Sequence, residues 1–350
     1  MLGGQIFINR TRHHRASRLS RRRGTPINTL LSIVIPTLNR ATLLGQLLDR
    51  LAREVEWLPA ERRERVEVVV GDNASDDATQ ATVAPMREHN WFRAVRFENR
   101  VCGDDSIART VDLAQGRFVW VFGDDDALAD GFLRPVVERL IAQPDHVLYY
   151  YNRLLLNADF THVVRIAHID WPSEYEEMPL GEFIRRFTHW PCFITSVIFP
   201  KERFQAGKAF AVERYAGWTQ VARLFFVPTH GTVSVGYYPL VVQRLGVQSW
   251  KGDWPQYWLI NMPTMLADLE NVGITSGAVE QWLRHEVTYY RVAADVLVAK
   301  AYGLDWRNPF WLGVIRWQRG GKRLMIRIAQ FCLPCRFAKV LYCLLQKRYR

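Results

Sequence analysis

The 350-residue sequence contains only five cysteines, and its first segment lacks an apolar run. A small, odd number of cysteines suits free thiols in a reducing compartment better than a disulfide framework. The start of the chain is Arg-rich without an apolar core, so we expect no signal peptide. Cys332 and Cys335 have the spacing of a redox or zinc pair, but no second pair lies nearby and Pro334 stands between them. These absences favour a cytoplasmic protein without disulfides.

The chain has a net charge of +11, and its two ends are the source of this excess because they contain no acidic residue. Residues 1–30 hold seven arginines and residues 311–350 hold ten lysines or arginines, whereas 31–310 has a net charge of −6. A protein whose main face binds nucleic acid would carry its positive charge on the folded body. We therefore expect no nucleic-acid partner, and we expect the basic ends to meet an anionic membrane surface.

The last 40 residues mix tryptophan and aliphatic side chains with regularly spaced basic residues. Their longest uncharged run, 328–335, has eight residues, whereas a membrane-spanning helix needs about 20. The pattern predicts a basic amphipathic helix in the membrane interface, with Trp311, Trp317 and Tyr342 as anchors. A helix packed on its own domain with a solvated basic face is the alternative. The expected location is peripheral, at the cytoplasmic face of the inner membrane.

The body of the chain alternates between strand-like and helical patterns. Strands are expected at 30–35, 66–70, 94–97, 117–122, 146–156, 163–166, 193–199 and 232–238. Helices are expected between the first four strands and at 133–142 and 214–226, an irregular stretch at 170–191, and helix again from 257 onward. This rhythm predicts an α/β fold with a mostly parallel sheet flanked by helices and a helical C-terminal extension.

The same patterns divide the chain into four parts. We expect a disordered basic arm at 1–29, a first half of the sheet domain at 30–145, a second half at 146–250 and a helical region at 251–350 that ends in the basic tail. No internal repeat is present.

Three aspartates follow the strand expected at 117–122. Asp124, Asp125 and Asp126 would lie at the carboxyl end of that strand, where open α/β sheets bind ligands. Carboxylates this close repel one another unless a cation neutralises them, and a hard divalent ion could also bridge a diphosphate. The cluster therefore predicts a Mg²⁺ or Mn²⁺ site. A solvated acidic turn in which Asp130 caps the next helix is the alternative.

Loops after two other strands complete a candidate nucleotide site. The first strand is followed by Pro36, Thr37, Leu38, Asn39 and Arg40, and the second by Asp72 and Asn73. A nucleotide needs a polar slot for its base, an acceptor for base or ribose hydrogens and a cation for its diphosphate, and these loops supply the three parts in that order. Neither a Gly-x-Gly-x-x-Gly nor a Walker sequence is present, which argues against dinucleotide and P-loop enzymes.

Four segments together resemble a known family: SIVIPTLNR, VVVGDNASDD, ENRVCGDDSIARTVDLAQGRFVWV and FGDDDAL. They are similar to family 2 glycosyltransferases of the GT-A fold, and among these to bacterial O-antigen sugar transferases of the abequosyltransferase type. The resemblance covers residues 30–135. It implies transfer of a sugar from a nucleotide-diphosphate sugar to a lipid-linked saccharide acceptor in bacterial surface polysaccharide synthesis, with Mg²⁺ or Mn²⁺ assistance.

The resemblance also implies roles for single residues in donor binding. The base and nucleotide pocket would be lined by Pro36, Thr37, Leu38 and Asn39, with Asp72 accepting a hydrogen bond from base or ribose, Arg109 facing the sugar nucleotide and Arg244 reaching the diphosphate. The metal ligands would be either Asp124 and Asp126 or Asp125 and Asp126. As alternatives, Asp72 and Ser75 cap a helix, and Arg109 is a solvated helix residue.

The catalytic base is the least defined part of the predicted site. Inverting relatives use an Asp or Glu in a motif that corresponds here to VERYAGWTQVARLF, and the usual acid pair is missing from it. Glu213 is the nearest carboxylate and the predicted base, and its alternative role is that of an acid at a helix start.

Two other classes stay open. A sugar-phosphate nucleotidyltransferase would normally carry a Gly-rich signature with a lysine near its first strand, and PTLNRATLLG lacks both features. A non-catalytic, basic-tailed membrane-binding protein would explain the two ends of the chain, but would leave the acidic motifs without a purpose.

Overall fold

The computed structural model describes residues 29–165, 174–245 and 256–288, with isolated positions between 300 and 340. The basic arm expected at 1–29 lies outside the described residues except for Thr29, and so does most of the tail at 311–350. None of the helices that are described combines the length and the apolar character needed to cross a membrane.

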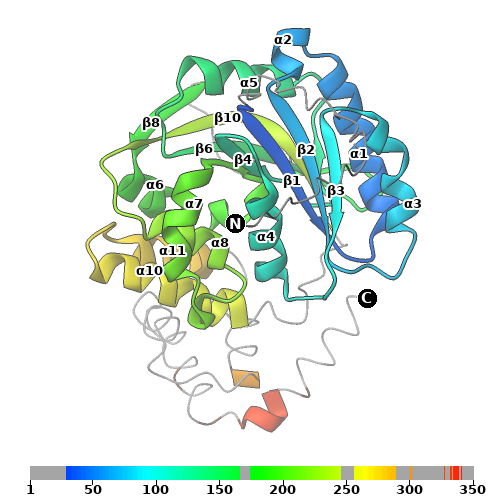
Figure 1. Ribbon diagram of the computed structural model, residues 1–350. Coiled ribbons are helices and arrows are strands. Elements are labelled where there is room, and N and C mark those ends of the chain that lie inside the picture. The colour runs from blue at the N-terminus through cyan, green and yellow to red at the C-terminus, as the bar shows by residue number, and fades with distance from the viewer. Residues whose placement is uncertain are drawn as a thin grey trace, which may run out of the picture.

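A ten-stranded sheet forms the centre of the molecule (Figure 1). Its strands are β1 Leu31–Thr37, β2 Val66–Asp72, β3 Phe92–Arg96, β4 Phe118–Val121, β5 Ala127–Leu128, β6 Leu148–Leu156, β7 Val163–Arg165, β8 Tyr175–Pro179, β9 Val197–Pro200 and β10 Thr232–Arg244. Eight of them lie in the order β3-β2-β1-β4-β9-β6-β10-β5, while β7 pairs with β6 and β8 with β10.

The pairing is parallel in two blocks that an antiparallel strand joins. β1 pairs in parallel with β2 and β4, and β2 with β3, as the sequence predicts. β6 and β10 form the second parallel pair. β9 lies between the blocks and runs antiparallel to both β4 and β6. The two halves expected on either side of residue 145 therefore share one sheet.

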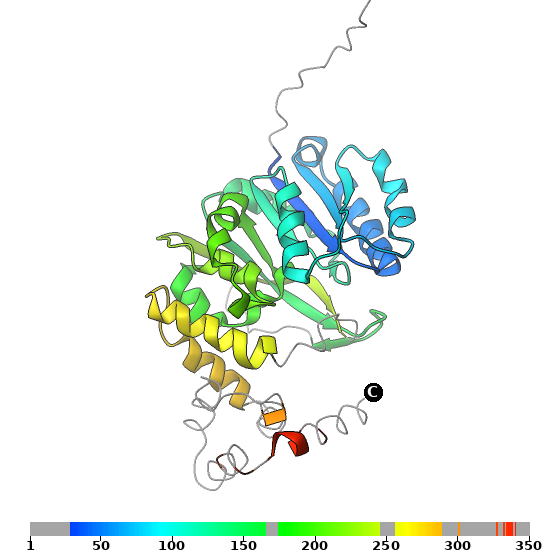
Figure 2. The same cartoon turned by 60° about the horizontal axis from the view of Figure 1, so that its bottom comes forward.

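Helices cover both faces of this sheet, and α10 and α11 lie at the end away from α1 (Figures 1 and 2). The first face carries α1 Ala41–Glu56, α2 Ala60–Arg63, α3 Thr79–Val83 and α5 Leu133–Ala142, and the second carries α4 Gly103–Leu113, α6 Leu180–Phe187, α7 Lys201–Ala206, α8 Thr219–Phe225, α10 Met262–Asn271 and α11 Ala278–Thr288. Alternation along β1 sends Ile33 and Ile35 into the core beneath α1, and Val34 into the core beneath α4. Because both faces are covered, the central strands β1, β2 and β4 are mostly apolar on both sides, with Ser32 and Glu67 among the buried polar exceptions.

Several stretches differ from the sequence-based expectation. The segment 170–191, expected to be irregular, contains β8 and α6 in its described part, because β8 gains a partner in the antiparallel pairing with β10. β10 continues to Arg244, since register shifts around Pro239 absorb the proline. The helix expected at 214–226 starts only at Thr219, and the strand expected at 193–199 opens with a 3₁₀ turn at Ile194–Ser196.

The N-terminus of α5 is capped from α1 and not by Asp130. Glu54 is 2% exposed and accepts hydrogen bonds from the backbone N–H groups of Gly131 at 2.6 Å and Leu133 at 3.1 Å. The exposed Asp130 carboxylate lies 3.5 Å from the Arg50 guanidinium instead. Capping of α5 therefore does not account for the acidic residues after β4.

Candidate active site

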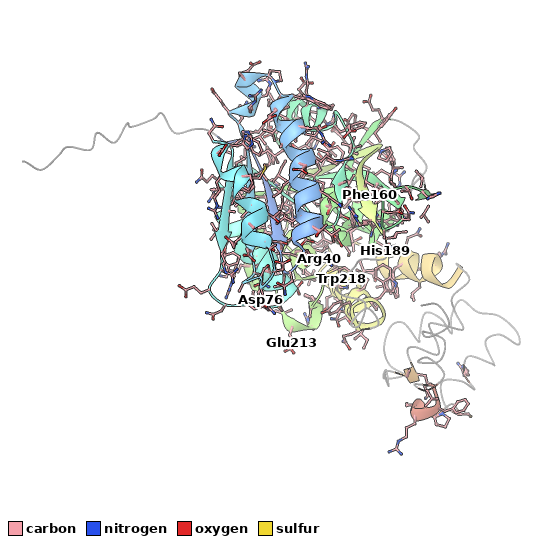
Figure 3. All side chains as sticks on the ribbon, turned by 90° about the vertical axis from the view of Figure 1, so that its right-hand side faces the viewer. Arg40, Asp76, Phe160, His189, Glu213 and Trp218 are labelled. Carbon is pink, nitrogen blue, oxygen red and sulfur yellow. The ribbon has the colours of Figure 1, made fainter. Side chains whose placement is uncertain are left out.

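A cavity of about 600 Å³ opens where β1, β4 and β10 end. Part of its lining is acidic and basic, with Arg40, Asp125 and Asp126. Another part is aromatic, with His189, Trp218, Tyr257 and Trp258. Figure 3 shows Arg40, Trp218 and His189 gathered in one region of the molecule. The cavity thus joins the loop of residues 124–126, called the acidic loop below, to aromatic side chains from the second half of the sheet domain and from the C-terminal helices.

Asp124 does not line this cavity and is neutralised by neighbours. Its carboxylate lies 2.8 Å from Nη1 of Arg40 and accepts a hydrogen bond of 2.7 Å from the Thr37 hydroxyl. Burial raises the pKa of Asp124 to about 6, although Arg40 and Thr37 oppose the rise. Thr37 therefore positions an aspartate, while its neighbour Pro36 lines the cavity.

Asp125 and Asp126 face the cavity directly. Asp125 lies 2.9 Å from Nη1 of Arg40. Asp126 is 5% exposed and accepts a 2.7 Å hydrogen bond from the Thr195 hydroxyl and a long, 3.4 Å bond from the backbone N–H of Arg244. Burial and the charge of Asp125 raise the pKa of Asp126 well above its usual value. A cation placed beside these two carboxylates would lower the free energy of their charged forms.

The donor set fits a divalent cation that a substrate helps to hold. Within residues 29–165, 174–245 and 256–288, no three His, Cys, Asp or Glu side chains are grouped as a complete metal site. Mg²⁺ is usually bound through one or two carboxylates together with substrate phosphates. Asp125 and Asp126 both line the cavity and can supply those carboxylates, although Arg40 pairs with Asp125 as well as with Asp124. Asp124 does not line the cavity and is also held by the Thr37 hydroxyl. Of the two expected ligand pairs, this arrangement favours Asp125 and Asp126.

Arg244 holds the acidic loop against two other segments. Its Nε donates to the Asp125 carbonyl at 3.1 Å, Nη1 to the Ala158 carbonyl at 2.7 Å and Nη2 to Gln46 Oε1 at 2.7 Å. The guanidinium also lies 3.8 Å from the centre of the Phe160 ring, which Figure 3 labels. Arg244 therefore lines the cavity as a brace for Asp125, and its direct contact with a diphosphate stays a prediction.

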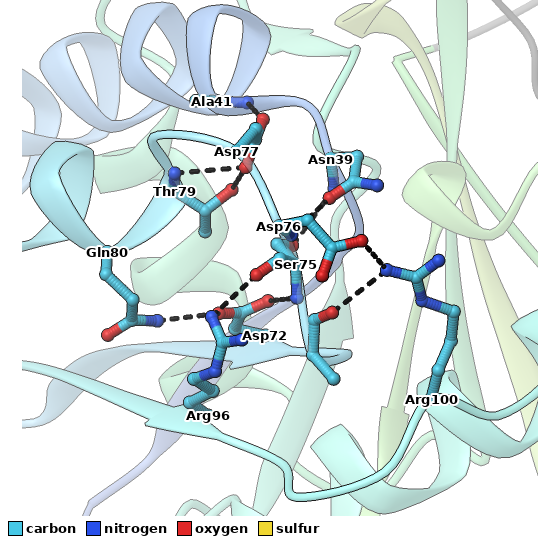
Figure 4. Close-up of polar contacts among 11 residues, drawn as sticks. Asn39, Ala41, Asp72, Ser75, Asp76, Asp77, Thr79, Gln80, Arg96 and Arg100 are labelled. Atoms are coloured by element: carbon cyan, nitrogen blue, oxygen red, sulfur yellow. Dashed lines mark hydrogen bonds and ion pairs between the residues drawn. The ribbon is translucent and has the colours of Figure 1, made fainter.

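Asp72 and Asn39 lie outside the cavity lining and organise the neighbouring loops (Figure 4). Asp72 is 1% exposed and accepts hydrogen bonds from the Ser75 N–H at 2.8 Å and the Gln80 side chain at 2.6 Å. Asn39 adopts a positive φ of 54° and accepts a 2.7 Å bond from the Asp76 N–H. These contacts do not cap α3, so the helix-capping alternative for Asp72 and Ser75 is not borne out. The contact of Asp72 with a nucleotide stays a prediction.

Arg109 and Glu213 are not brought to the cavity. Helix α4 presents Gly103, Asp104 and Ile107 to it, while the exposed Arg109 donates to the Asn99 carbonyl at 3.3 Å. Glu213 begins the 3₁₀ turn Glu213–Tyr215, is exposed and lies at the lower edge of the molecule in Figure 3. The structure thus offers no cavity contact for either predicted role. Leu38 is half-buried and also lies outside the cavity lining.

Several polar residues of the cavity were given no role from the sequence, among them Arg40, Thr195 and Asp104. Arg40 and Thr195 bind the acidic loop, and Asp104 lies where α4 meets the turn before α8. Arg40 could have been found, because a cation next to the PTLN segment is a natural partner for three carboxylates. Thr195 and Asp104 gain their neighbours only through contacts between distant segments of the chain.

A second hollow, of about 950 Å³, lies at the other end of the sheet, beside the starts of β4 and β6. Three cations line it, and each already donates to main-chain carbonyls. Arg203 binds the Leu224 carbonyl, Lys201 the Ala114 carbonyl and Arg117 the Pro144 carbonyl. These side chains connect segments of the fold, so we place the active site at the acidic cavity.

Residues 32–197 match the model of glycosyl transferase family 2, and this part of the chain belongs to that family. A curated relative, abequosyltransferase RfbV of Salmonella typhimurium, is 30% identical over 189 residues. These residues are 51% of this chain and 54% of the relative, so the match spans about half the length of that protein. The family predicted from the four motifs is confirmed.

Solved structures of S. aureus TarS 1-349 share the fold. The complex with UDP aligns with a TM-score of 0.57 at 14% identity, and the complex with UDP-GlcNAc with a TM-score of 0.55 at 13% identity. Each alignment covers 92% of this chain and 93% of the other. The prediction of a GT-A fold with a helical C-terminal part is confirmed, and identity this low carries no conclusion about substrate.

Proposed function

We propose that the protein transfers a sugar from a nucleotide-diphosphate sugar to a saccharide acceptor within the acidic and aromatic cavity. The observation that carries this proposal is the meeting of Asp125 and Asp126 with Trp218, Tyr257 and Trp258 in one cavity of a family 2 domain. The carboxylates suit a metal–diphosphate group. Aromatic rings offer apolar faces against which the C–H face of a pyranose can pack.

The chemistry follows from the bond that breaks. The bond between the anomeric carbon and the phosphate oxygen opens through an oxocarbenium-like transition state, and the leaving diphosphate gains negative charge. Asp125 and Asp126 would hold Mg²⁺ or Mn²⁺, which would supply positive charge to that leaving group. Arg244 fixes the backbone of the acidic loop, and Arg40 neutralises Asp124 beside it.

The name of the curated relative, abequosyltransferase, supports the transfer of a sugar, and the sequence motifs imply a role in O-antigen synthesis. On that basis we propose an acceptor built from a lipid-linked saccharide, as the sequence motifs imply. The seven and ten basic residues at the two ends of the chain, which hold no acidic residue, support a position at an anionic membrane surface on the cytoplasmic side.

A screen of nucleotide sugars tests the proposed activity. Purified protein is incubated with UDP-, GDP-, CDP- and TDP-sugars, with Mn²⁺, Mg²⁺ or EDTA, and release of the nucleoside diphosphate is measured. We expect one nucleotide class to be hydrolysed, and its diphosphate to raise the melting temperature only when a divalent ion is present. Absence of both hydrolysis and a melting shift for all four classes would contradict the proposal.

The membrane proposal has its own test. We expect full-length protein to sediment with vesicles containing phosphatidylglycerol and to be released by high salt, because charge attraction is screened. Deletion of 311–350 should abolish this binding, whereas vesicles of phosphatidylcholine alone should bind neither form. Equal binding by the two forms would return the tail to its alternative role, packing on its own domain.

A further inference from the structure

The cavity needs a group that accepts a proton from the incoming hydroxyl, and the expected segment does not provide one. Within residues 213–226, Glu213 is the only carboxylate, and it is exposed and outside the cavity lining. The part of this segment that reaches the cavity is Ala216, Gly217, Trp218 and Gln220. None of these four side chains is a base at neutral pH.

A carboxylate from a distant helix lies against this same turn. Asp104, in the first turn of α4, accepts a 2.8 Å hydrogen bond from the backbone N–H of Gly217, 113 residues away in the sequence. The Thr219 hydroxyl at the start of α8 also bonds to it. Asp104 and Gly217 both line the cavity. The structure thus brings an acid to the segment from which the acid is missing.

The other acids of the cavity are committed elsewhere. Asp104, Asp125 and Asp126 are the only carboxylates in the cavity lining among the described residues. Asp125 pairs with Arg40, and Asp126 accepts a hydrogen bond from the Thr195 hydroxyl. Both aspartates belong to the acidic loop, which we propose binds the diphosphate. Asp104 is hydrogen-bonded instead to Gly217, which precedes Trp218 in the turn before α8. This turn belongs to the aromatic part of the lining, which we propose receives the saccharide.

We propose that Asp104 is the general base that activates the acceptor hydroxyl, an assignment that rests on the proposed function. The hydroxyl oxygen forms a bond to the anomeric carbon of the donor sugar as the bond from that carbon to the phosphate oxygen breaks. The hydroxyl proton moves to the Asp104 carboxylate, and the nucleoside diphosphate leaves with the bonding electron pair. The hydrogen bonds from Gly217 and Thr219 hold the carboxylate in place.

The surroundings of Asp104 suit this task. Burial raises the pKa of Asp104, while the Gly217 N–H and the Thr219 hydroxyl oppose the rise. A carboxylate whose pKa is raised is a better proton acceptor than an exposed one. Arg223 on α8 and Asp105 on α4 are the other charged groups that act on it.

The test compares Asp104→Asn with Asp105→Asn, a matched control that removes the exposed neighbouring carboxylate. The probe reaction is hydrolysis of the nucleotide sugar identified by the screen, with water as the acceptor. We expect Asp104→Asn to lower kcat by about 100-fold or more, with binding of the nucleoside diphosphate and the melting temperature close to wild type. Asp105→Asn should retain wild-type turnover.

Because Asp104 also connects α4 to α8, a second variant separates chemistry from scaffolding. Asp104→Glu keeps a carboxylate, and we expect it to keep the fall in kcat at acidic pH that Asp104→Asn loses. The assignment is overturned if Asp104→Asn keeps more than a tenth of kcat, or if it loses nucleoside diphosphate binding together with turnover. A 100-fold loss in Glu213→Gln or His189→Gln but not in Asp104→Asn would also overturn it. Absence of wild-type hydrolysis would overturn the proposed function, and this assignment with it.

Discussion

Asp126→Asn is expected to lower sugar transfer or donor hydrolysis by a factor of about 100 to 1000, the range found when one preorganised electrostatic group is removed from an active site. The substitution removes one of the two carboxylates that face the cavity, and with it one proposed ligand of the cation. Turnover under saturating donor with Mn²⁺ measures the effect. Asp130→Asn is the matched control, since it removes an exposed carboxylate four positions along the chain.

The same variant should fold at least as well as the wild type. The amide oxygen of an asparagine can still accept a hydrogen bond from the Thr195 hydroxyl, and the substitution removes the buried negative charge of Asp126. Burial raises the pKa of Asp126 in the folded protein. The contribution of this carboxyl group to the free energy of unfolding is therefore fully present below its unfolded pKa of about 4, and it is lost as the pH rises through the folded pKa. In metal-free buffer we therefore expect equal stability near pH 3.5 and a more stable variant at pH 8. Urea unfolding at both values checks this, and a variant less stable at pH 8 would contradict the assigned burial cost.

Gly207→Ala is expected to lower the free energy of unfolding by about 3 kcal/mol or more, because it overpacks a backbone contact. A Cβ atom on Gly207 would lie 1.9 Å from the carbonyl oxygen of Arg223 in α8. Main-chain atoms cannot rotate away, so α7 and α8 would have to separate. That movement would also strain the bonds from Arg203 on α7 to the carbonyls of Leu224 and Val227.

Gly45→Ala provides the comparison for Gly207→Ala. Gly45 lies inside α1, where an added Cβ would make an ordinary 3.4 Å contact with Thr82. Alanine is the better helix former, so we expect this variant to gain about 0.5 to 1 kcal/mol. Urea unfolding of the two variants gives the difference. Equal stabilities would show that α7 and α8 adjust to the extra atom at little cost.

The strands that lead into the candidate site could be predicted because their signals are local. Apolar runs bounded by Pro36, Gly71 and Gly123 fixed β1, β2 and β4, and parallel pairing then placed the three aspartates at one edge of the sheet. Helix α1 followed from the spacing of its leucines. β8 could not be read in the same way, because YEEMP becomes a strand only through its pairing with β10.

The partners of the site residues depended on contacts between distant segments. The sequence places Asp124, Asp125 and Asp126 in one row, but only the fold separates Asp124, which Arg40 and Thr37 engage, from the two that face the cavity. Proximity in sequence to a motif predicts Glu213 as the base. No local pattern connects Asp104 with that motif, because its hydrogen-bond partner Gly217 lies 113 residues further along the chain.

The late position of β10 in the chain has a consequence for biosynthesis. The acidic loop is fastened by Arg244, which is 118 residues downstream of Asp126, and β5 has its partner in the same strand. At a ribosomal rate of roughly 10 residues per second, the loop emerges about 10 seconds before the strand that secures it. A nascent or prematurely ended polypeptide therefore carries all three aspartates without the cavity that they help to line, and the proposed site is complete only with the second half.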